Sequence, residues 1–223
     1  WVGQGKMSFD RNAFQQLCSR EGFLSGPALR SGKVYGVKSF EHPIDRLEDR
    51  CETVLNFLAQ FDGRFIHDPA AWGASLQPEL RKYLVDLAAR EQRIRLAMDT
   101  HGTLAFAAGA VLDTKSGRVV EVEQRTPLTT LWAPDDQQPN AAWNAWDFRT
   151  SVLRSDRPDV AVAVALNRDI EAAVTRYVEQ RLPDVGRLLV ARPSGGISQT
   201  SIACGAHANL MAEGLAERIR TER

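Results

Sequence analysis

Three short polar clusters, each directly after an apolar run, carry the groups in this sequence that are best suited to binding an anion. They are residues 99–103 (DTHGT), 167–169 (NRD) and 193–201 (PSGGISQTS). Hydroxyls, an imidazole, an arginine and glycine backbone that a ligand can approach closely all suit phosphate oxygens. The clusters therefore predict a phosphate-binding site. Its candidate residues are His101, Gly102, Thr103, Asn167, Arg168, Asp169, Pro193, Ser194, Gly195, Gly196, Gln199 and Ser201.

Each cluster also has a purely structural interpretation, which the residues alone leave open. A serine or threonine of residues 193–201 can cap a following helix, and so can Asn167 or Asp169. His101 can be a loop histidine whose ring nitrogens are satisfied within the protein. Residues 193–201 lack both the Walker lysine and the G-x-G-x-x-G spacing, so neither familiar phosphate motif applies.

Three of the five tryptophans, Trp132, Trp143 and Trp146, fall in the loop-rich stretch 126–157. An aromatic side chain in a loop can stack on a base, a contact worth about 1–3 kcal/mol in single-strand binders. The structural alternative is packing, because a tryptophan buries a large apolar area. Trp143 and Trp146 are three residues apart and can share a helical face, which favours packing for at least one of them. Trp132 and Trp146 are kept as candidate base-stacking residues.

Patterns for catalysis or metal binding have little support. Ser194 does not lie in a G-x-S-x-G elbow. Cys204 and His207, three residues apart, are better explained as a small buried residue beside a surface histidine. None of the four histidines has a second metal ligand at a useful local spacing. We therefore expect no catalytic residue, no metal site and no cofactor in this chain.

The composition is that of a soluble globular protein without an overall charge. Apolar residues make up 43%, and 28 Lys and Arg balance 28 Asp and Glu. A neutral chain has no global field for a nucleic-acid backbone, so we expect no direct binding of DNA or RNA. Three scattered cysteines, no signal peptide and no long apolar run predict a cytoplasmic protein that avoids the membrane. The opening residues WVGQGK are typical of a linker, so we expect a fragment of a longer protein.

Strands and helices must position the clusters, and the pattern predicts two strand–helix–strand units. The first covers 93–98, 103–112 and 118–124, and the second covers 159–166, 169–181 and 187–192. Near-continuous apolar strands that alternate with helices predict a mainly parallel sheet flanked by helices. Further expectations are a short strand within 24–43, helices at 10–23, 46–61, 76–92 and 200–222, a helix face of Leu76, Leu80, Leu84 and Leu87, and another of Ile170, Val174, Tyr177 and Val178.

The three clusters should meet at one edge of the sheet. Open parallel sheets bind ligands beyond the carboxyl ends of their strands, and each cluster follows a predicted strand there. The helices that follow should present unpaired N–H groups and the positive end of a dipole to the same edge. Such an edge suits a ligand with phosphates.

Several short motifs of the chain together resemble one family of sensor domains. They are residues 159–220, the stretch 61–72 (FDGRFIHDPAAW), the stretch 101–113 (HGTLAFAAGAVLD) and the region around Trp132. These resemble SAVED domains, the sensor modules of bacterial anti-phage CBASS effectors. The resemblance spans roughly residues 46–222, so we expect a SAVED domain at 46–223. Residues 1–45 are then a linker and N-terminal extension.

The resemblance implies two fused CARF-like, Rossmann-type halves, at about 46–125 and 158–223, joined by the tryptophan-rich region. It also implies recognition of a cyclic oligonucleotide, such as a cyclic dinucleotide of the cGAMP type or a cyclic trinucleotide. Binding would drive self-association and activate a fused effector that is absent from this chain, of which an HNH-type DNA endonuclease is the best match. The sensor itself would carry out no chemistry. Two alternatives stay open: a nucleotide-cleaving enzyme that uses His101 or His207 as a base, and a pure oligomerisation module.

Overall fold

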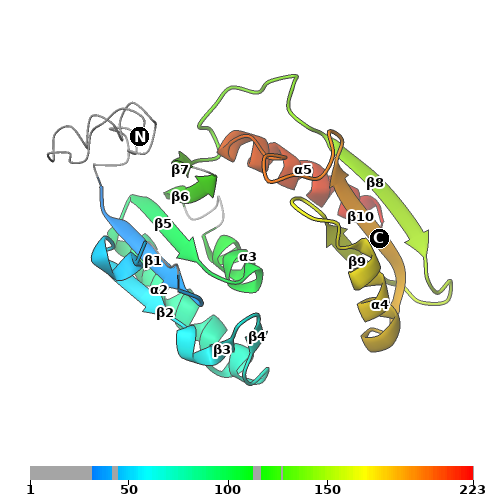
Figure 1. The fold of residues 1–223 in the computed structure, drawn as a ribbon, viewed down its shortest axis with the longest axis horizontal. Helices are drawn as coiled ribbons and strands as arrows, with labels where there is room; N and C mark the ends of the chain where they lie inside the picture. Colours follow the sequence, from blue (N-terminus) through cyan, green and yellow to red (C-terminus); the bar gives the residue numbers. More distant parts are fainter. Residues whose placement is uncertain (1–31, 42–44, 113–116, 127, 223) are drawn as a thin grey trace, which may run out of the picture. The chain divides into compact units, whose positions relative to one another are not determined.

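The computed structural model describes residues 32–41, 45–112, 117–126 and 128–222. The chain divides into two compact units, the first ending at Trp132 and the second beginning at Ala133. Each unit has its own sheet and its own helices, which Figure 1 labels. The helix expected at 10–23 lies outside the described residues.

The first unit is built on a five-stranded sheet. Its strands are β1 (Val34–Lys38), β2 (Thr53–Asn56), β5 (Arg93–Asp99), β6 (Val119–Thr126) and β7 (Leu128–Trp132), in the order β2-β1-β5-β6-β7. All neighbours are parallel except β6 and β7, which run antiparallel. The short strand expected within 24–43 is confirmed as β1, which lies inside the sheet although the sequence assigns it to an N-terminal extension.

Helices cover one face of this sheet and form the core with it. α2 (Gln77–Arg90) follows a π-helical turn η5 (Trp72–Leu76), and α3 (Gly102–Val111) connects β5 to β6. The predicted face is confirmed, because Leu76, Leu80, Leu84 and Leu87 are all at most 1% exposed. They pack with inward residues of the strands, such as Val37 and Ile94. The predicted strand–helix–strand unit is therefore present as β5-α3-β6.

The helix expected at 46–61 is wrong. This stretch forms the short helical turns η3 (Leu47–Asp49) and η4 (Leu58–Gln60) around strand β2, and then begins the hairpin of β3 (Phe61–Asp62) and β4 (Phe65–Ile66). Residues 53–56 form a strand instead of a helix because they can pair in parallel with β1, with Val54 directly opposite Gly36. A Cβ on Gly36 would lie 3.0 Å from a Val54 methyl, so the glycine makes room for this packing.

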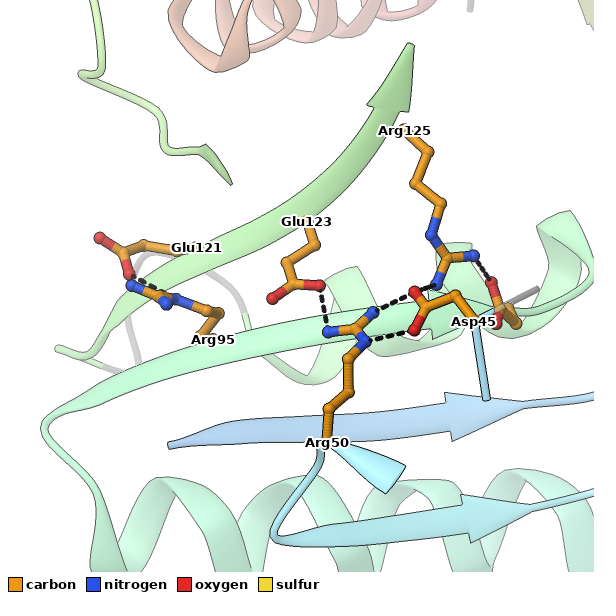
Figure 2. Close-up of polar contacts among 7 residues, drawn as sticks. Asp45, Arg50, Arg95, Glu121, Glu123 and Arg125 are labelled. Carbon is orange, nitrogen blue, oxygen red and sulfur yellow. Dashed lines mark hydrogen bonds and ion pairs between the residues drawn. The ribbon is translucent and has the colours of Figure 1, made fainter. Parts of the chain in front are cut away.

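The opposite face of the first sheet carries an array of ion pairs (Figure 2). Arg50 pairs with Asp45 at 2.8 Å and with Glu123 of β6 at 2.6 Å. Arg125, also on β6, pairs with Asp45 at 2.7 Å and with Asp99 at the end of β5. The array thus ties the η3–β2 segment to the sheet and neutralises these charged groups in pairs.

The second unit has a three-stranded sheet with two helices. Its strands are β8 (Trp146–Val152), β9 (Asp159–Val164) and β10 (Val185–Pro193), in the order β8-β10-β9. β9 and β10 are parallel, and β8 is antiparallel to β10. Helix α4 (Glu171–Arg181) connects β9 to β10, and α5 (Gly205–Thr221) follows β10. The second predicted strand–helix–strand unit is confirmed as β9-α4-β10.

Three finer expectations for the tryptophan-rich and C-terminal regions are wrong. The stretch 126–157 is less loop-rich than expected, because it contains the strands β7 and β8. Polar residues interrupt the apolar pattern of both strands, so the sequence gives only a weak strand signal there. The last helix begins at Gly205 instead of residue 200, since the chain first completes a compact loop. Tyr177 is 58% exposed, because α4 buries only a narrow stripe around Val178.

The fold is thus mixed α/β, with parallel strand pairs in both sheets and helices flanking them, as the sequence predicts. In the described residues, no helix combines the length and apolar character that a bilayer span requires. The same residues contain no group of three or more His, Cys, Asp and Glu side chains placed to hold a metal ion.

Candidate functional site

The first unit contains a cavity at the carboxyl edge of its parallel strands. Its volume is about 690 Å³, within the ~300–1,000 Å³ typical of small-molecule pockets. Its walls are mainly aromatic and apolar, with one arginine and the start of α3. They comprise Phe61, Arg64, Phe65, Ile66, Pro69, Trp72, His101, Gly102 and Thr103. Three of the candidate residues from sequence, His101, Gly102 and Thr103, therefore lie together at this cavity.

Both ring nitrogens of His101 are engaged within the protein. Nε2 lies 2.9 Å from the carbonyl oxygen of Gly63, and Nδ1 lies 2.6 Å from the hydroxyl of Ser39. Because a carbonyl only accepts hydrogen bonds, Nε2 carries a proton, and in the neutral ring Nδ1 then accepts from Ser39. The imidazole also stacks on Phe61, with ring centroids 4.2 Å apart and planes within 9°.

The N-terminus of α3 opens into the cavity. His101 is the N-cap residue in an extended conformation, and the first turn holds no acidic residue. The first N–H groups of a helix have no acceptor within the helix, and they carry the positive end of its dipole. Gly102 and Thr103 are both exposed. This end of α3 can therefore receive an anionic group.

Arg64 adds a positive charge to the cavity wall. It is exposed at the turn of the β3–β4 hairpin, and among the described residues it forms no ion pair. By contrast, Arg50 and Arg125 on the other face of the sheet are each bound by two carboxylates. A guanidinium that is not paired with a carboxylate has its N–H donors available for a ligand, and the geometry of these donors matches a phosphate group.

In the second unit the other two clusters lie against each other. Strands β9 and β10 are parallel, so both end at the same edge. The N–H of Ser198 donates to the carbonyl oxygen of Leu166 at 3.1 Å, and Arg192 pairs with Asp169 at 2.8 Å. The structure thus brings residues 167–169 and 193–201 together. The 99–103 cluster belongs to the first unit, so the expectation that all three meet stays a prediction.

Several candidates in the second unit hold this edge together through their own contacts. Ser201 is 3% exposed, and its hydroxyl accepts the N–H of Ser198 at 2.8 Å. The Ser194 hydroxyl accepts the N–H of Ala145 at 3.1 Å. Asp169 accepts the N–H of Glu171, the first residue of α4, but the N-cap residue of this helix is Ile170, so the prediction of Asn167 or Asp169 as the N-cap is wrong.

Other candidates at this edge are exposed. In the described part of the chain, the side chains of Asn167, Arg168 and Gln199 make no hydrogen bond or ion pair, and all three are open to solvent. Gly195 and Gly196 are exposed as well, and Gly196 has φ +93, a conformation that favours glycine. Pro193 is buried at the end of β10. The side chains that remain free for a ligand here are those of Asn167, Arg168 and Gln199.

The N-terminus of α5 is already occupied by a carboxylate. Asp136 accepts the N–H groups of Gly205 at 2.8 Å and Ala206 at 2.9 Å. Burial alone would raise the pKa of Asp136, but hydrogen bonds from Ala206, Gly205 and Ala133 outweigh it and hold the pKa below the usual aspartate value. Unlike α3, this helix therefore offers no free terminus to an anion.

The tryptophans lie in sheets and packing contacts. Trp132 is partly buried at the end of β7, where it pairs with Val122 of β6. The indole N–H of Trp146 on β8 donates to the Met211 carbonyl oxygen of α5 at 2.6 Å. Trp143 stacks on His207 with ring centroids 5.1 Å apart. The polar group of Trp146 is thus used in holding α5 to the sheet, which fits the packing alternative.

The β3–β4 hairpin and the segment after it form most of the first cavity, and none of their residues is among the candidates from sequence. Phe61, Arg64, Phe65 and Trp72 all lie in FDGRFIHDPAAW, a stretch that contributes only to the family resemblance. The Asp-Gly pair inside it is a strong hairpin signal, flanked here by aromatic residues. That signal identifies the hairpin, but the expected helix at 46–61 overlapped it.

A family model described as SAVED, the SMODS-associated and fused to various effectors sensor domain, matches residues 76–223. CD-NTase-associated protein 4 of Enterobacter hormaechei is 28% identical over 214 residues, which cover 94% of this chain and 42% of that protein. A solved structure with a similar fold is the Acinetobacter baumannii Cap4 SAVED/CARF-domain containing receptor with the cyclic trinucleotide 2'3'3'-cAAA. It has a TM-score of 0.55 and 12% identity, with 95% of this chain and 44% of that chain covered. The chain thus spans less than half the length of both proteins.

Proposed function

The chain belongs to the SAVED family of sensor domains, and we propose that it binds a cyclic oligonucleotide as a signal. The observation that carries the proposal is the cavity of the first unit, where Arg64 lines the same space as the α3 N-terminus and several aromatic rings and pairs with no carboxylate of the described residues. The related Cap4 receptor was solved with a cyclic trinucleotide, which supports this ligand class.

The chemistry of the cavity matches the two parts of such a ligand. A cyclic oligonucleotide presents phosphodiester charges, which suit the Arg64 guanidinium and the N–H groups of Gly102 and Thr103. It also presents flat bases, which can stack on aromatic side chains such as Phe65 and Trp72. In the second unit, Asn167, Arg168 and Gln199 offer a further set of donors. Asp169, Ser194 and Ser201 hold the backbone that carries these side chains.

The non-enzymatic role is favoured by the state of the two histidines that an enzyme would use. His101 has both ring nitrogens engaged. His207 is 2% exposed; its Nδ1 accepts the N–H of Ala203 and its Nε2 lies 2.8 Å from the Asn144 carbonyl oxygen. Neither imidazole offers a free nitrogen to a substrate, so we propose a sensor that leaves its ligand intact.

Two further parts of the proposal concern the ring size of the ligand and the effect of its binding on the whole protein. The cyclic dinucleotide expected from sequence and the trinucleotide of the Cap4 receptor are both candidates. We further propose that ligand binding favours a self-associated state and thereby activates a fused DNA endonuclease. Such a shift requires the ligand to bind the associated state more tightly than the free one.

Isothermal titration with a panel of cyclic di- and trinucleotides tests the ligand class. We expect one or more of them to bind at micromolar concentration or tighter, and their linear counterparts to bind at least about tenfold more weakly because they lose the preorganised ring. Arg64→Gln should weaken binding, whereas Lys82→Gln, which removes an exposed charge on α2 away from the cavity, should not. A panel without any binding ligand would refute the sensor proposal. Light scattering with and without the ligand then tests self-association.

A further inference from the structure

The tip of the β3–β4 hairpin carries two exposed residues of the cavity wall, Arg64 and Phe65. Gly63 and Arg64 form the turn, where Gly63 has φ +54, and Phe65 follows with 78% of its surface exposed. Phe61 and Ile66, at the base of the hairpin, pack against the core of the unit. The base is thus anchored by apolar contacts, and the tip needs another contact to hold its position.

His101 provides that contact. Its Nε2 donates to the carbonyl oxygen of Gly63 at 2.9 Å, at the turn itself. Its ring stacks flat on Phe61 and meets the edge of Phe40, with centroids 4.2 and 5.8 Å away. The ring is therefore bound to the tip by a hydrogen bond and to the base by stacking.

Ser39, at the end of β1, fixes the imidazole from the other side. Its hydroxyl lies 2.6 Å from Nδ1 and accepts the backbone N–H of His101 at 2.9 Å. Ser39 is only 2% exposed, so it belongs to the rigid interior. A continuous path of contacts thus runs from the sheet through Ser39 and His101 to the hairpin tip.

We propose that His101 is a positioning residue that fixes the β3–β4 hairpin, and that Arg64 and Phe65 on this hairpin contact the ligand. The inference rests on the proposed function and changes the role of His101 from a ligand donor to a support. A ligand that took Nε2 or Nδ1 would have to displace the Gly63 carbonyl or the Ser39 hydroxyl, which would leave a protein group without its partner. Arg64 can bind a ligand without displacing a hydrogen-bond partner within the described residues.

Hydrogen exchange of the ligand-free chain, combined with titration, tests the inference. His101→Phe keeps the aromatic stack but removes both ring hydrogen bonds. We expect it to raise the exchange rate of residues 61–66 about fivefold, the factor expected for one lost hydrogen bond, and to weaken ligand binding. Arg64→Gln should leave the exchange of residues 61–66 unchanged and weaken binding about tenfold, because one charge-assisted contact is lost. Phe65→Leu should behave like Arg64→Gln.

A further variant keeps the inference separate from folding defects, and exchange without ligand keeps it separate from the proposed function. Ser39→Ala removes the support of Nδ1 but keeps the imidazole, and it should raise the exchange of residues 61–66 in the same direction as His101→Phe. The inference is overturned if His101→Phe weakens binding while residues 61–66 exchange at the wild-type rate, or if Arg64→Gln binds as tightly as the wild type. If the wild-type chain binds no cyclic oligonucleotide, the proposed function fails, and exchange in the ligand-free variants still decides whether His101 fixes the hairpin.

Discussion

Asp136 accepts a hydrogen bond from the backbone N–H of Gly205 at 2.8 Å, although the two residues are 69 positions apart. The same carboxylate also accepts the N–H of Ala206, so it adds a cap from a distant segment to the local one, in which the Cys204 sulfur accepts the N–H of His207. The contact fixes where α5 begins and fastens the segment after Ala133 to that helix. It also engages the first N–H groups of α5, which are therefore not available to an anion.

Replacing this cap should destabilise the second unit. We expect Asp136→Ala to lower the free energy of unfolding by about 1 kcal/mol, as for other lost helix caps. Because Asp136 is exposed to solvent, screening keeps the electrostatic part of this effect small. Urea denaturation measures the loss, and Asp135→Ala is a matched control, since this exposed neighbour makes no hydrogen bond or ion pair within the described residues. Equal stability of the two variants would contradict the capping role.

The same cap should make the stability of the chain depend on pH. The pKa of Asp136 is lower in the folded chain than in the unfolded one, so the folded state favours the carboxylate. Its contribution is present above the unfolded value, about 3.9, and is lost as the pH falls through the lower folded value. The stability difference between the wild type and Asp136→Ala should therefore shrink below about pH 4. A difference that stays constant from pH 7 to pH 3 would argue against this linkage.

Arg50 should be the most sensitive member of the ion-pair array in Figure 2. It holds Glu123, whose side chain is only 5% exposed, and Asp45 at the same time. Arg50→Met would leave the Glu123 carboxylate buried without its partner, so we expect a loss of about 3 kcal/mol. The double variant Arg50→Met with Glu123→Gln removes the buried charge and should recover part of that loss. Chemical denaturation of the set measures both, and additive effects would show that the two residues are not coupled.

Two glycines should respond in opposite ways to alanine. A Cβ on Gly186 of β10 would lie 2.0 Å from the backbone oxygen of Arg157, so the backbone would have to shift. We expect Gly186→Ala to cost about 2 kcal/mol or more, as for other overpacked sites. Gly109 in α3 has open space around its Cβ position, and Gly109→Ala should stabilise by about 0.5–1 kcal/mol through helix propensity. Thermal unfolding measures the stability change of both variants. An unchanged stability of Gly186→Ala would mean that the backbone at Arg157 can move at no cost and would contradict the prediction.

The sequence predicts the elements that depend on local pattern. The leucines of α2 repeat at helical spacing and are all buried, and the apolar strands β5 and β9 pair in parallel with their neighbours as expected. Stretch 46–61 shows why such patterns have limits. Its apolar residues fit a helix, but β1 is available for pairing and draws Thr53 and Val54 into a strand. That choice depends on a partner far along the chain, which spacing within the stretch does not reveal.

For the candidate site, too, the sequence predicts what depends on local pattern and misses what depends on distant contacts. Residues 99–103, 167–169 and 193–201 were predicted at strand ends, and each does follow a strand. The sequence could not tell which polar groups are already used. Asp136 reaches α5 from a distant loop, the indole of Trp146 is bound by Met211, and His101 is bound by Ser39 and Gly63. Long-range contacts therefore separate the occupied donors from those, such as Arg64 and Arg168, that have no partner in the described part of the chain.

Arg168 and Arg192 form a matched pair that tests the second unit. Arg168 is exposed and without a partner among the described residues, whereas Arg192 pairs with Asp169 and with Glu171, each at 2.8 Å. Arg168→Gln should change the free energy of unfolding by less than about 0.5 kcal/mol, yet weaken binding of the cyclic oligonucleotide about tenfold because a phosphate contact is lost. Arg192→Gln should cost up to about 1 kcal/mol of stability, because it removes two ion pairs near the start of α4, although Glu171 keeps a second pair with Arg149. Titration and urea denaturation of both variants give the comparison. If Arg168→Gln binds the ligand like the wild type, Arg168 does not contact a phosphate of the ligand, and the prediction for this residue is wrong.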